Sequence, residues 1–209
     1  MSELDRVLLE SFRDAIAARL GLHFDDGKLD LLADVAAERL EALGQPSLEA
    51  SVARLAADAD PDEPRALAEK LTVGETYFFR NRNDLDAFAQ VVLPTRMRAR
   101  GAERRLRILS AGCSSGEEPY TLAMIVRGLR ALDGWDVQVR GIDVNPAAIA
   151  RARAARYGEW SLRQTSPEAR ARFFLGDRRD VRVVDEVRAL VEVEERNLLE
   201  EDPAFWRPG

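Results

Sequence analysis

The sequence predicts an α/β fold in which a helical N-terminal bundle precedes a parallel, doubly wound sheet. Apolar residues recur with the helical period through residues 1–72. From Arg105 the pattern changes to strand, glycine-bearing loop, helix and strand, and further helices and a strand follow. This alternating order favours parallel strands joined by right-handed crossovers. With 209 residues, 46% of them hydrophobic, the chain can bury a core.

The first 72 residues are expected to form a bundle of four short helices. The expected first helix carries its apolar stripe on Val7, Leu8, Phe12, Ala15, Ile16 and Leu20, and Gly21 ends it. The other three are expected over Asp26–Leu43, over Ala50–Ala57 after the N-cap Ser47, and over Arg65–Leu71 after a turn at Pro61 and Pro64.

Residues 73–104 are interpreted as a connector, and residues 105–209 as the start of a cofactor-binding α/β domain. The connector begins with VGETYFFRN, whose aromatic residues we interpret as core packing, and continues as a helix from Asn83 to about Arg100 that Pro94 would kink or split. In the α/β domain, strands are expected at LRILSA, VQVRGID and Leu190–Glu194, and helices at NPAAIARARAARY and SPEARARFF, with Asn145 and Ser166 as caps.

Composition excludes several classes of function. No apolar run approaches the roughly 18 residues of a membrane span, and no signal peptide is present, so we expect a soluble cytoplasmic protein without membrane insertion. Single Cys113 and single His23 offer neither a disulfide nor a metal site. Residues 1–70 hold 8 basic and 16 acidic side chains, a net charge of −8 within a total of −6, which argues against nucleic-acid binding.

The loop Ser110–Gly116 and the carboxylate of Asp143 form the candidate ligand site. Both follow predicted strands, and ligands of open α/β sheets bind at the carboxyl ends of strands. Gly112 allows close approach of a ligand to the backbone. A carboxylate placed like that of Asp143 binds the ribose hydroxyls of adenosine cofactors. Together these features predict a cofactor site rather than an ordinary strand-to-helix turn.

Two acids, Glu117 and Glu118, open the helix after this loop. The NAD pattern G-x-G-x-x-G is absent, and two carboxylates would repel a pyrophosphate. No G-K-[ST] follows the loop, which excludes a P-loop. A cationic ligand without phosphate suits the loop better. We therefore predict S-adenosyl-L-methionine, which carries a sulfonium and an α-amino group, as the cofactor.

The chain resembles the chemotaxis receptor methyltransferases of the CheR type. The stretches that carry the resemblance are LTVGETYFFRN, SAGCSSGEEPYTLAM, GIDVNPAAIARARAARY, SPEARARFF and NLL, and it covers nearly the whole chain. It implies a class I methyltransferase Rossmann-like sheet. The implied activity is methyl transfer from S-adenosyl-L-methionine to glutamate side chains of chemoreceptor cytoplasmic helices, giving methyl esters and S-adenosyl-L-homocysteine.

The resemblance also implies roles for single residues. Arg80 would bind the methionyl carboxylate beside Thr76 and take part in catalysis, because a guanidinium fork matches a carboxylate. Glu118 would take the α-amino group, Asp143 the ribose, and Asn197 and Leu198 the adenine, while Gly112 belongs to the loop and Cys113 packs within it. Neither a metal nor a general base is required, since an ionised carboxylate attacks the methyl group in line.

Two departures from the family bear on function. The resemblance implies further strands and a small β insertion after Asn197, so we interpret the chain as a fragment or truncated form. The unpaired sheet edge would then favour self-association or a partner. The expected second helix carries Lys28 and Arg39 against five acids, where the family has a basic, receptor-facing helix. Two alternatives therefore stay open: a non-catalytic signalling adaptor, and a methyltransferase for another nucleophile.

Overall fold

A computed structural model of the protein describes residues 3–57, 60–177 and 180–206, and the chain divides into two compact units. The helical unit comprises Met1–Val73, Val144–Pro146 and Asn197–Glu201. The α/β unit comprises Gly74–Asp143, Ala147–Arg196 and Asp202–Gly209, and therefore includes the connector. Within the described residues, no helix is both long and apolar enough to cross a membrane.

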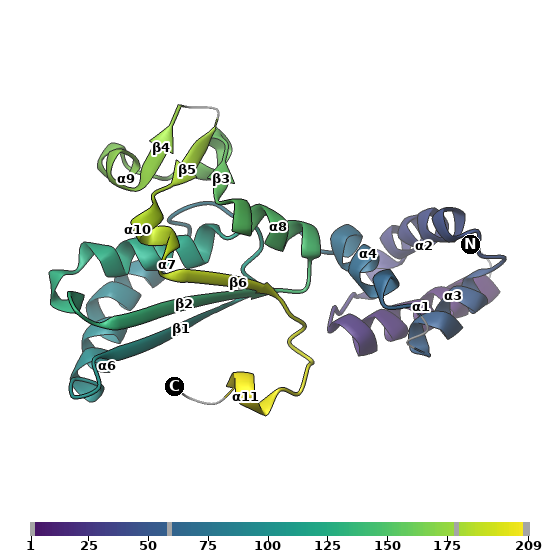
Figure 1. Ribbon diagram of the computed structural model, residues 1–209. Helices are drawn as coiled ribbons and strands as arrows, with labels where there is room; N and C mark the ends of the chain where they lie inside the picture. The colour runs from purple at the N-terminus through teal and green to yellow at the C-terminus, as the bar shows by residue number, and fades with distance from the viewer. Residues whose placement is uncertain (1–2, 58–59, 178–179, 207–209) are drawn as a thin grey trace. The chain divides into compact units, whose positions relative to one another are not determined.

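The helical unit contains the four expected helices (Figure 1). They are α1 (Glu3–Leu20), α2 (Leu29–Leu43) after the 3₁₀ turn η1 (Asp26–Lys28), α3 (Leu48–Ala56) and α4 (Asp62–Leu71). Gly44 closes α2 in the left-handed conformation with φ 58°, and the Ser47 hydroxyl accepts the Ala50 N–H at 3.4 Å. The end of the second helix and the cap of the third are confirmed.

Two details of the expected helices are wrong. The fourth helix begins at Asp62, three residues before Arg65, because Pro64 is tolerated in a first helical turn, where its missing N–H needs no partner. On α1, Val7 is 53% exposed and Leu9 is buried instead. The core of the helical unit is formed by Leu9, Phe12, Ile16, Leu20, Leu29, Leu32, Val35, Ala36, Leu55, Leu67, Ala68 and Leu71.

Two segments that follow strands of the sheet return to the helical unit, each held by an amide side chain. The Asn145 amide donates to the Thr72 hydroxyl oxygen at 2.8 Å, and Val144 packs against the helical core. The Asn197 amide donates to the carbonyl of Arg19 at 2.7 Å. These bonds explain why short pieces near residues 145 and 197 belong to a unit otherwise built from the first 73 residues.

A bidentate ion pair joins α2 to α4. The Arg39 guanidinium contacts the Glu63 carboxylate at 2.6 and 3.2 Å, and their side chains are only 17% and 10% exposed. The hydrogen bonds that the Arg39 guanidinium donates to the Glu63 carboxylate raise the pKa of Arg39. Removing one partner would leave the other charge buried without a partner, which costs far more than loss of a surface pair.

Replacement Glu63→Ala is expected to lower the free energy of unfolding of the helical unit by about 3 kcal/mol. The matched control is Glu38→Ala, whose pair with Lys70 joins the same two helices but is exposed, and a change below about 1 kcal/mol is expected there. Urea unfolding followed by circular dichroism measures both. Equal losses of unfolding free energy in the two variants would show that the buried Arg39–Glu63 pair contributes no more to stability than the exposed pair.

The α/β unit is built on a parallel three-stranded sheet, as expected. Its strands β1 (Arg105–Ala111), β2 (Asp136–Asp143) and β6 (Val191–Glu195) lie in the order β1-β2-β6. Helix α7 (Glu117–Gly128) connects β1 to β2, and α8 (Pro146–Ala154) follows β2. Tyr120, Ala123 and Met124 of α7 pack in one core with Val139 of β2.

The connector helix is interrupted before Pro94, as expected. It consists of α5 (Arg82–Ala87), a π-helical turn η2 (Phe88–Val92) and α6 (Leu93–Ala99). The Leu93 N–H donates to the Phe88 carbonyl, five residues earlier. Pro94 lacks an N–H and its ring excludes the ordinary i−4 contact, so the wider turn accommodates it. Leu93 is thereby buried against Leu106 and Val126.

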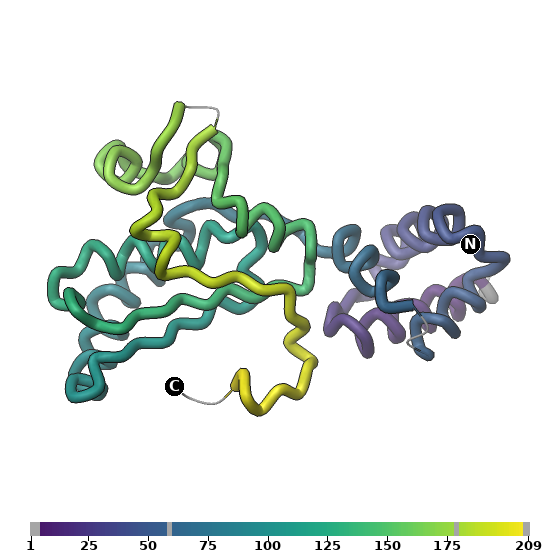
Figure 2. The backbone as a smooth tube through the Cα atoms, viewed as in Figure 1, coloured from purple at the N-terminus to yellow at the C-terminus, as the bar shows by residue number. Residues whose placement is uncertain are grey.

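The chain between β2 and β6 forms a second, antiparallel sheet, and its backbone projects from one side of the main sheet (Figure 2). It comprises β3 (Arg156–Tyr157), β4 (Phe174–Gly176) and β5 (Val181–Val183) in the order β3-β5-β4, with η4 (Glu159–Leu162) and α9 (Pro167–Phe173) between β3 and β4 and α10 (Asp185–Arg188) before β6. The expectation that NPAAIARARAARY is helical throughout is wrong, since α8 ends at Ala154. This small β element precedes Asn197, whereas the β insertion that the resemblance implies was expected after it.

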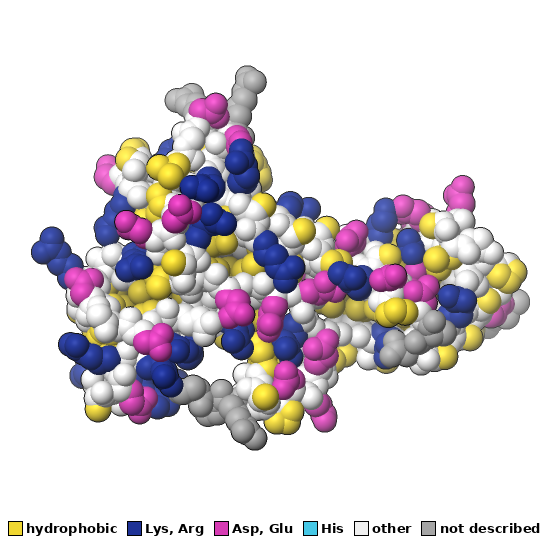
Figure 3. Space-filling model, in the orientation of Figure 1, with side chains coloured by type: hydrophobic (Ala, Val, Ile, Leu, Met, Phe, Trp, Pro, Cys, Tyr) yellow, Lys and Arg dark blue, Asp and Glu magenta, His cyan; other side chains and the backbone are white. Residues whose placement is uncertain are grey.

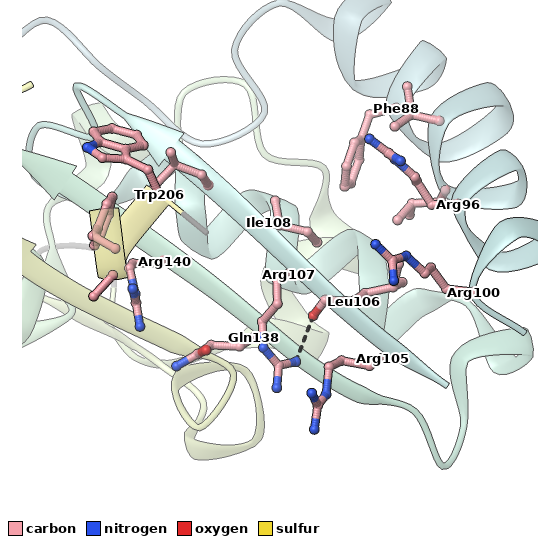
Figure 4. A pocket seen from close by; sticks show the side chains of 15 residues that line it. Phe88, Arg96, Arg100, Arg105, Leu106, Arg107, Ile108, Gln138, Arg140 and Trp206 are labelled. Atoms are coloured by element: carbon pink, nitrogen blue, oxygen red, sulfur yellow. Dashed lines mark hydrogen bonds between the residues drawn. The ribbon is translucent and has the colours of Figure 1, made fainter. Parts of the chain in front are cut away.

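Strand β1 forms one edge of the main sheet and has no second strand partner within the described residues. A cavity of about 590 Å³ lies along this edge (Figure 4). Leu106 and Ile108 of β1 line it together with Phe88 of η2 and Trp206 of α11 (Pro203–Trp206). Five arginines also line it: Arg96, Arg100, Arg105, Arg107 and Arg140. The edge is thus open, and self-association through it stays a prediction.

Candidate functional site

The loop between β1 and α7 has the backbone geometry of a ligand-binding turn. Gly112, Ser114 and Gly116 have φ values of 72°, 49° and 94°. A Cβ atom on Gly116 would lie 2.8 Å from the Ala152 Cβ and 3.0 Å from the Tyr157 hydroxyl, so only glycine fits there. At Gly112 no atom lies within 4 Å of the Cβ position, which leaves open space beside the backbone.

Hydrogen bonds tie this loop to the carboxyl end of β2. The N–H groups of Gly112 and Cys113 both donate to the Ile142 carbonyl at 2.9 Å. The Ser114 N–H donates to Oδ2 of Asp143 at 2.8 Å. The sequence predicts that the loop and Asp143 share one site, because each follows a predicted strand of the same sheet. The structure brings them into direct contact.

The two acids at the start of α7 differ in burial. Glu117 is 2% exposed, and its carboxylate oxygens accept from the hydroxyls of Ser161 and Ser115 at 2.9 and 2.7 Å. Glu118 is exposed and accepts from the Ser110 hydroxyl at 2.6 Å. Only Glu118 therefore presents a carboxylate at the surface of the loop, and its role toward an α-amino group stays a prediction.

The segment 75–81 carries Thr76 and Arg80. Phe78 is fully buried and meets the rings of Tyr157 and Phe174 edge to face at 4.8 Å. Phe79 and Asn81, on either side of Arg80, have φ values of 59° and 56°. This backbone, which costs about 1 kcal/mol or more for each such residue, buries Phe78 while Arg80 stays exposed.

Arg80 lies beside an aromatic and cationic stack. Its Nη1 donates to the Glu75 carbonyl at 2.6 Å, and its guanidinium lies 5.7 Å from the Tyr77 ring centroid. The Arg163 guanidinium lies 3.7 Å from the Tyr77 centroid and 4.3 Å from that of Trp160. The interpretation of Tyr77 as simple core packing is incomplete, because its ring supports two cations. Thr76 is half-buried.

Asn197 and Leu198 belong to the helical unit, whereas the other five predicted site residues belong to the α/β unit. The carboxamide of Asn197 donates to Arg19 and accepts the Leu199 N–H at 2.9 Å, and Leu198 is 56% exposed. Asn197 follows β6 by two residues. Their roles beside an adenine stay predictions.

The described cavity at the β1 edge is separate from this site. None of the predicted site residues lines it. Its floor is apolar and arginines rim it, with Arg96 and Arg100 on the connector and Arg105 and Arg107 on β1 (Figure 4). Over the face seen in Figure 3, acidic and basic side chains are interspersed.

The loop lies in a locally negative field. Burial raises the pKa of the Cys113 thiol to about 12, and the carboxylates of Asp143, Glu118 and Glu117 act in the same direction. Cys113 is 1% exposed, so it is a packing residue and not a nucleophile. A cluster of carboxylates around an open loop favours a cationic ligand. The residues present therefore fit a sulfonium-bearing cofactor.

Cys113 is expected to resist alkylation by iodoacetamide at pH 8 in the native protein and to react fully in denaturant. The folded state raises the thiol pKa above the free value of about 8.5, so this group's contribution to stability is constant below that pH and declines as pH rises toward 12. Mass spectrometry before and after unfolding tests the labelling. Rapid native labelling would show that the loop opens.

Replacement Gly116→Ala is expected to destabilise the α/β unit by about 2 kcal/mol or more, because the left-handed φ and the clash with Ala152 act together. The matched control is Gly128→Ala at the end of α7, where nothing lies within 4 Å of the Cβ position and φ is ordinary. Thermal unfolding compares the two. A Tm for Gly116→Ala equal to that of the control would contradict the tight packing at this turn.

Sequence reasoning missed the partners that hold these groups. Ser161 and Tyr157 lie about forty residues beyond the loop in sequence, yet the Ser161 hydroxyl binds Glu117, and the Tyr157 hydroxyl donates to the Ser115 carbonyl at 2.8 Å. No motif marks Ser161. Tyr157 lies at the end of GIDVNPAAIARARAARY, where the sequence pattern predicts a helix.

Comparisons with known proteins identify similar chains. The family described as "CheR methyltransferase, SAM binding domain" matches residues 74–208. A "Probable chemotaxis protein methyltransferase" of Rhizobium etli is 29% identical over 88% of this chain and 70% of its own. "Chemotaxis protein methyltransferase 2" of Pseudomonas aeruginosa is 31% identical over 92% and 68%. A "Probable biofilm formation methyltransferase WspC" of Pseudomonas putida is 34% identical over 90% and 43%.

Proposed function

We propose that the chain, which belongs to the CheR methyltransferase family, methylates glutamate side chains of chemoreceptor-type proteins. S-adenosyl-L-methionine would be the methyl donor. The names of the similar proteins support a chemotaxis-type protein as the acceptor of the methyl group. The observation that carries the choice of cofactor is the glycine loop with Glu118 and Asp143 at the carboxyl ends of two parallel strands.

Five residues of the α/β unit would hold the cofactor. Exposed Glu118 suits an α-ammonium group, and Asp143 suits ribose hydroxyls beside the open backbone of Gly112. The exposed guanidinium of Arg80, next to Thr76, suits the methionyl carboxylate. Asn197 and Leu198, which follow β6 after Arg196, would contact the adenine. Each of these assignments follows the family motif that the residue occupies.

When bound, S-adenosyl-L-methionine supplies a methyl group on a positively charged sulfur. The chain's own residues have little bond-making to do, because an acceptor carboxylate is already ionised at neutral pH and needs no general base. Their contribution is to hold the donor and align the acceptor, which converts the reaction into an effectively unimolecular step. Arg80 would orient the methionyl end for this alignment.

The chain spans between 43% and 70% of the lengths of the three relatives named above, so activity of these 209 residues is itself a proposal. The acidic second helix bears on the acceptor. Residues 26–43 hold two basic side chains, Lys28 and Arg39, and five acidic ones. Arg39 is already paired with Glu63. An acidic acceptor segment would therefore meet repulsion on α2 and would dock elsewhere.

The test is calorimetric titration with S-adenosyl-L-homocysteine. Binding is expected, and Asp143→Asn should raise Kd about tenfold by removing the charge and one acceptor oxygen while leaving an oxygen for the Ser114 N–H. The exposed Asp133→Asn serves as control and should leave Kd unchanged. Absence of binding by the unaltered protein would overturn the assignment of the cofactor.

A non-catalytic adaptor is the second candidate, favoured by the open β1 edge of a three-stranded sheet. Transfer of labelled methyl to chemoreceptor-bearing membranes separates the two, because an adaptor transfers none. Base-labile label marks a glutamate ester. Base-stable label would instead indicate a methyltransferase for another nucleophile.

A further inference from the structure

Glu117 lies next to the proposed cofactor site, but its side chain is turned away from the surface. It is 2% exposed, and its two carboxylate oxygens accept from Ser161 and Ser115. A carboxylate can only accept hydrogen bonds, so both serine hydroxyls must donate, and their orientations are fixed. The proposed function assigns this buried charge no contact with cofactor or acceptor.

Two hydrogen-bonded routes connect Glu117 to the segment that carries Arg80. In the first, the Ser161 hydroxyl binds the Glu117 carboxylate at 2.9 Å while the Ser161 carbonyl accepts the Phe78 N–H at 2.9 Å. In the second, the Thr121 hydroxyl donates to the Glu117 carbonyl at 2.7 Å and accepts the Phe79 N–H at 3.2 Å. Both routes end one or two residues before Arg80.

Glu117 also holds the opposite side of the site. The Ser115 hydroxyl that donates to it at 2.7 Å belongs to the glycine loop, and the Ser115 carbonyl accepts from the Tyr157 hydroxyl. Through Ser115 and Ser161, the buried Glu117 side chain therefore links the glycine loop to Phe78, the residue next to the strained backbone at Phe79. Strained φ values persist only where surrounding contacts hold them.

We propose that Glu117 is a positioning residue that fixes Arg80 relative to the glycine loop, so that both ends of the cofactor are held at once. The inference rests on the proposed function, because it assumes that Arg80 binds the methionyl carboxylate. It adds to that function a residue outside the binding set. Without the Glu117 carboxylate, the Ser161 anchor of the Arg80 segment loses its partner and only the Thr121 anchor, which uses the main-chain carbonyl of residue 117, remains. Arg80 must then be ordered during binding at an entropic cost.

The experiment is a double-mutant cycle read as the Kd for S-adenosyl-L-homocysteine. Glu117→Gln keeps the shape but removes the charge and one acceptor, and is expected to raise Kd about tenfold. In an Arg80→Ala background the same change should raise Kd less than about twofold, because no guanidinium remains to be positioned. Ser161→Ala, which keeps the charge of Glu117 and removes one hydrogen bond, should show the same dependence on Arg80.

Controls separate positioning from other effects. Glu186→Gln removes an exposed charge on α10 and should leave Kd unchanged. Equal losses with and without Arg80 would indicate long-range attraction or general destabilisation and would overturn the positioning role. If Glu117→Gln fails to fold, the Ser161→Ala cycle decides alone. Absence of binding by the unaltered protein would overturn the proposed function as well, whereas additive losses on a binding protein overturn only this inference.

Discussion

The parallel register of β1 against β2 is the constraint on which the rest of the α/β unit depends. Ala111 pairs with Ile142, so both strands end at the same level. The first turn of the loop can therefore bond the Ile142 carbonyl, and the Ser114 N–H can reach Asp143. A slip of one residue would turn every side chain of one strand to the other face and separate the loop from its carboxylate. Burial of Val139 and Ile142 fixes the register.

Most elements follow from periodicity and from residues with strong local preferences. The cap by Ser47 and the interruption before Pro94 depend on contacts within a few residues, which a sequence displays directly. The two-residue strand Arg156–Tyr157 does not follow from local preferences. Its residues continue the pattern of a helix rich in alanine and arginine, and only pairing with Val181 and Arg182 makes them extended. Non-local pairing of this kind leaves no local signal.

The candidate site divides in the same way. Gly112, Glu118 and Asp143 could be identified because glycine and carboxylate groups at strand ends have a defined chemistry. Which of two adjacent glutamates is buried could not be inferred, because Ser161, 44 residues away, supplies the hydroxyl that stabilises Glu117. The geometry around Arg80 is likewise set by distant partners: Phe79, in the left-handed region, is held by Thr121 on α7.

The π-helical turn Phe88–Val92 makes the connector sensitive to the number of its residues rather than to their type. One residue fewer would replace this turn by an ordinary α-helical turn, in which the ring of Pro94 would clash with the carbonyl four residues earlier. Leu93, which is 1% exposed, depends on the wider turn for its place in the core, whereas Val91 and Val92 are exposed. Substitutions at Val91 and Val92 are thus tolerable where a single-codon deletion is not, and homologous helices should differ here in composition but not in length.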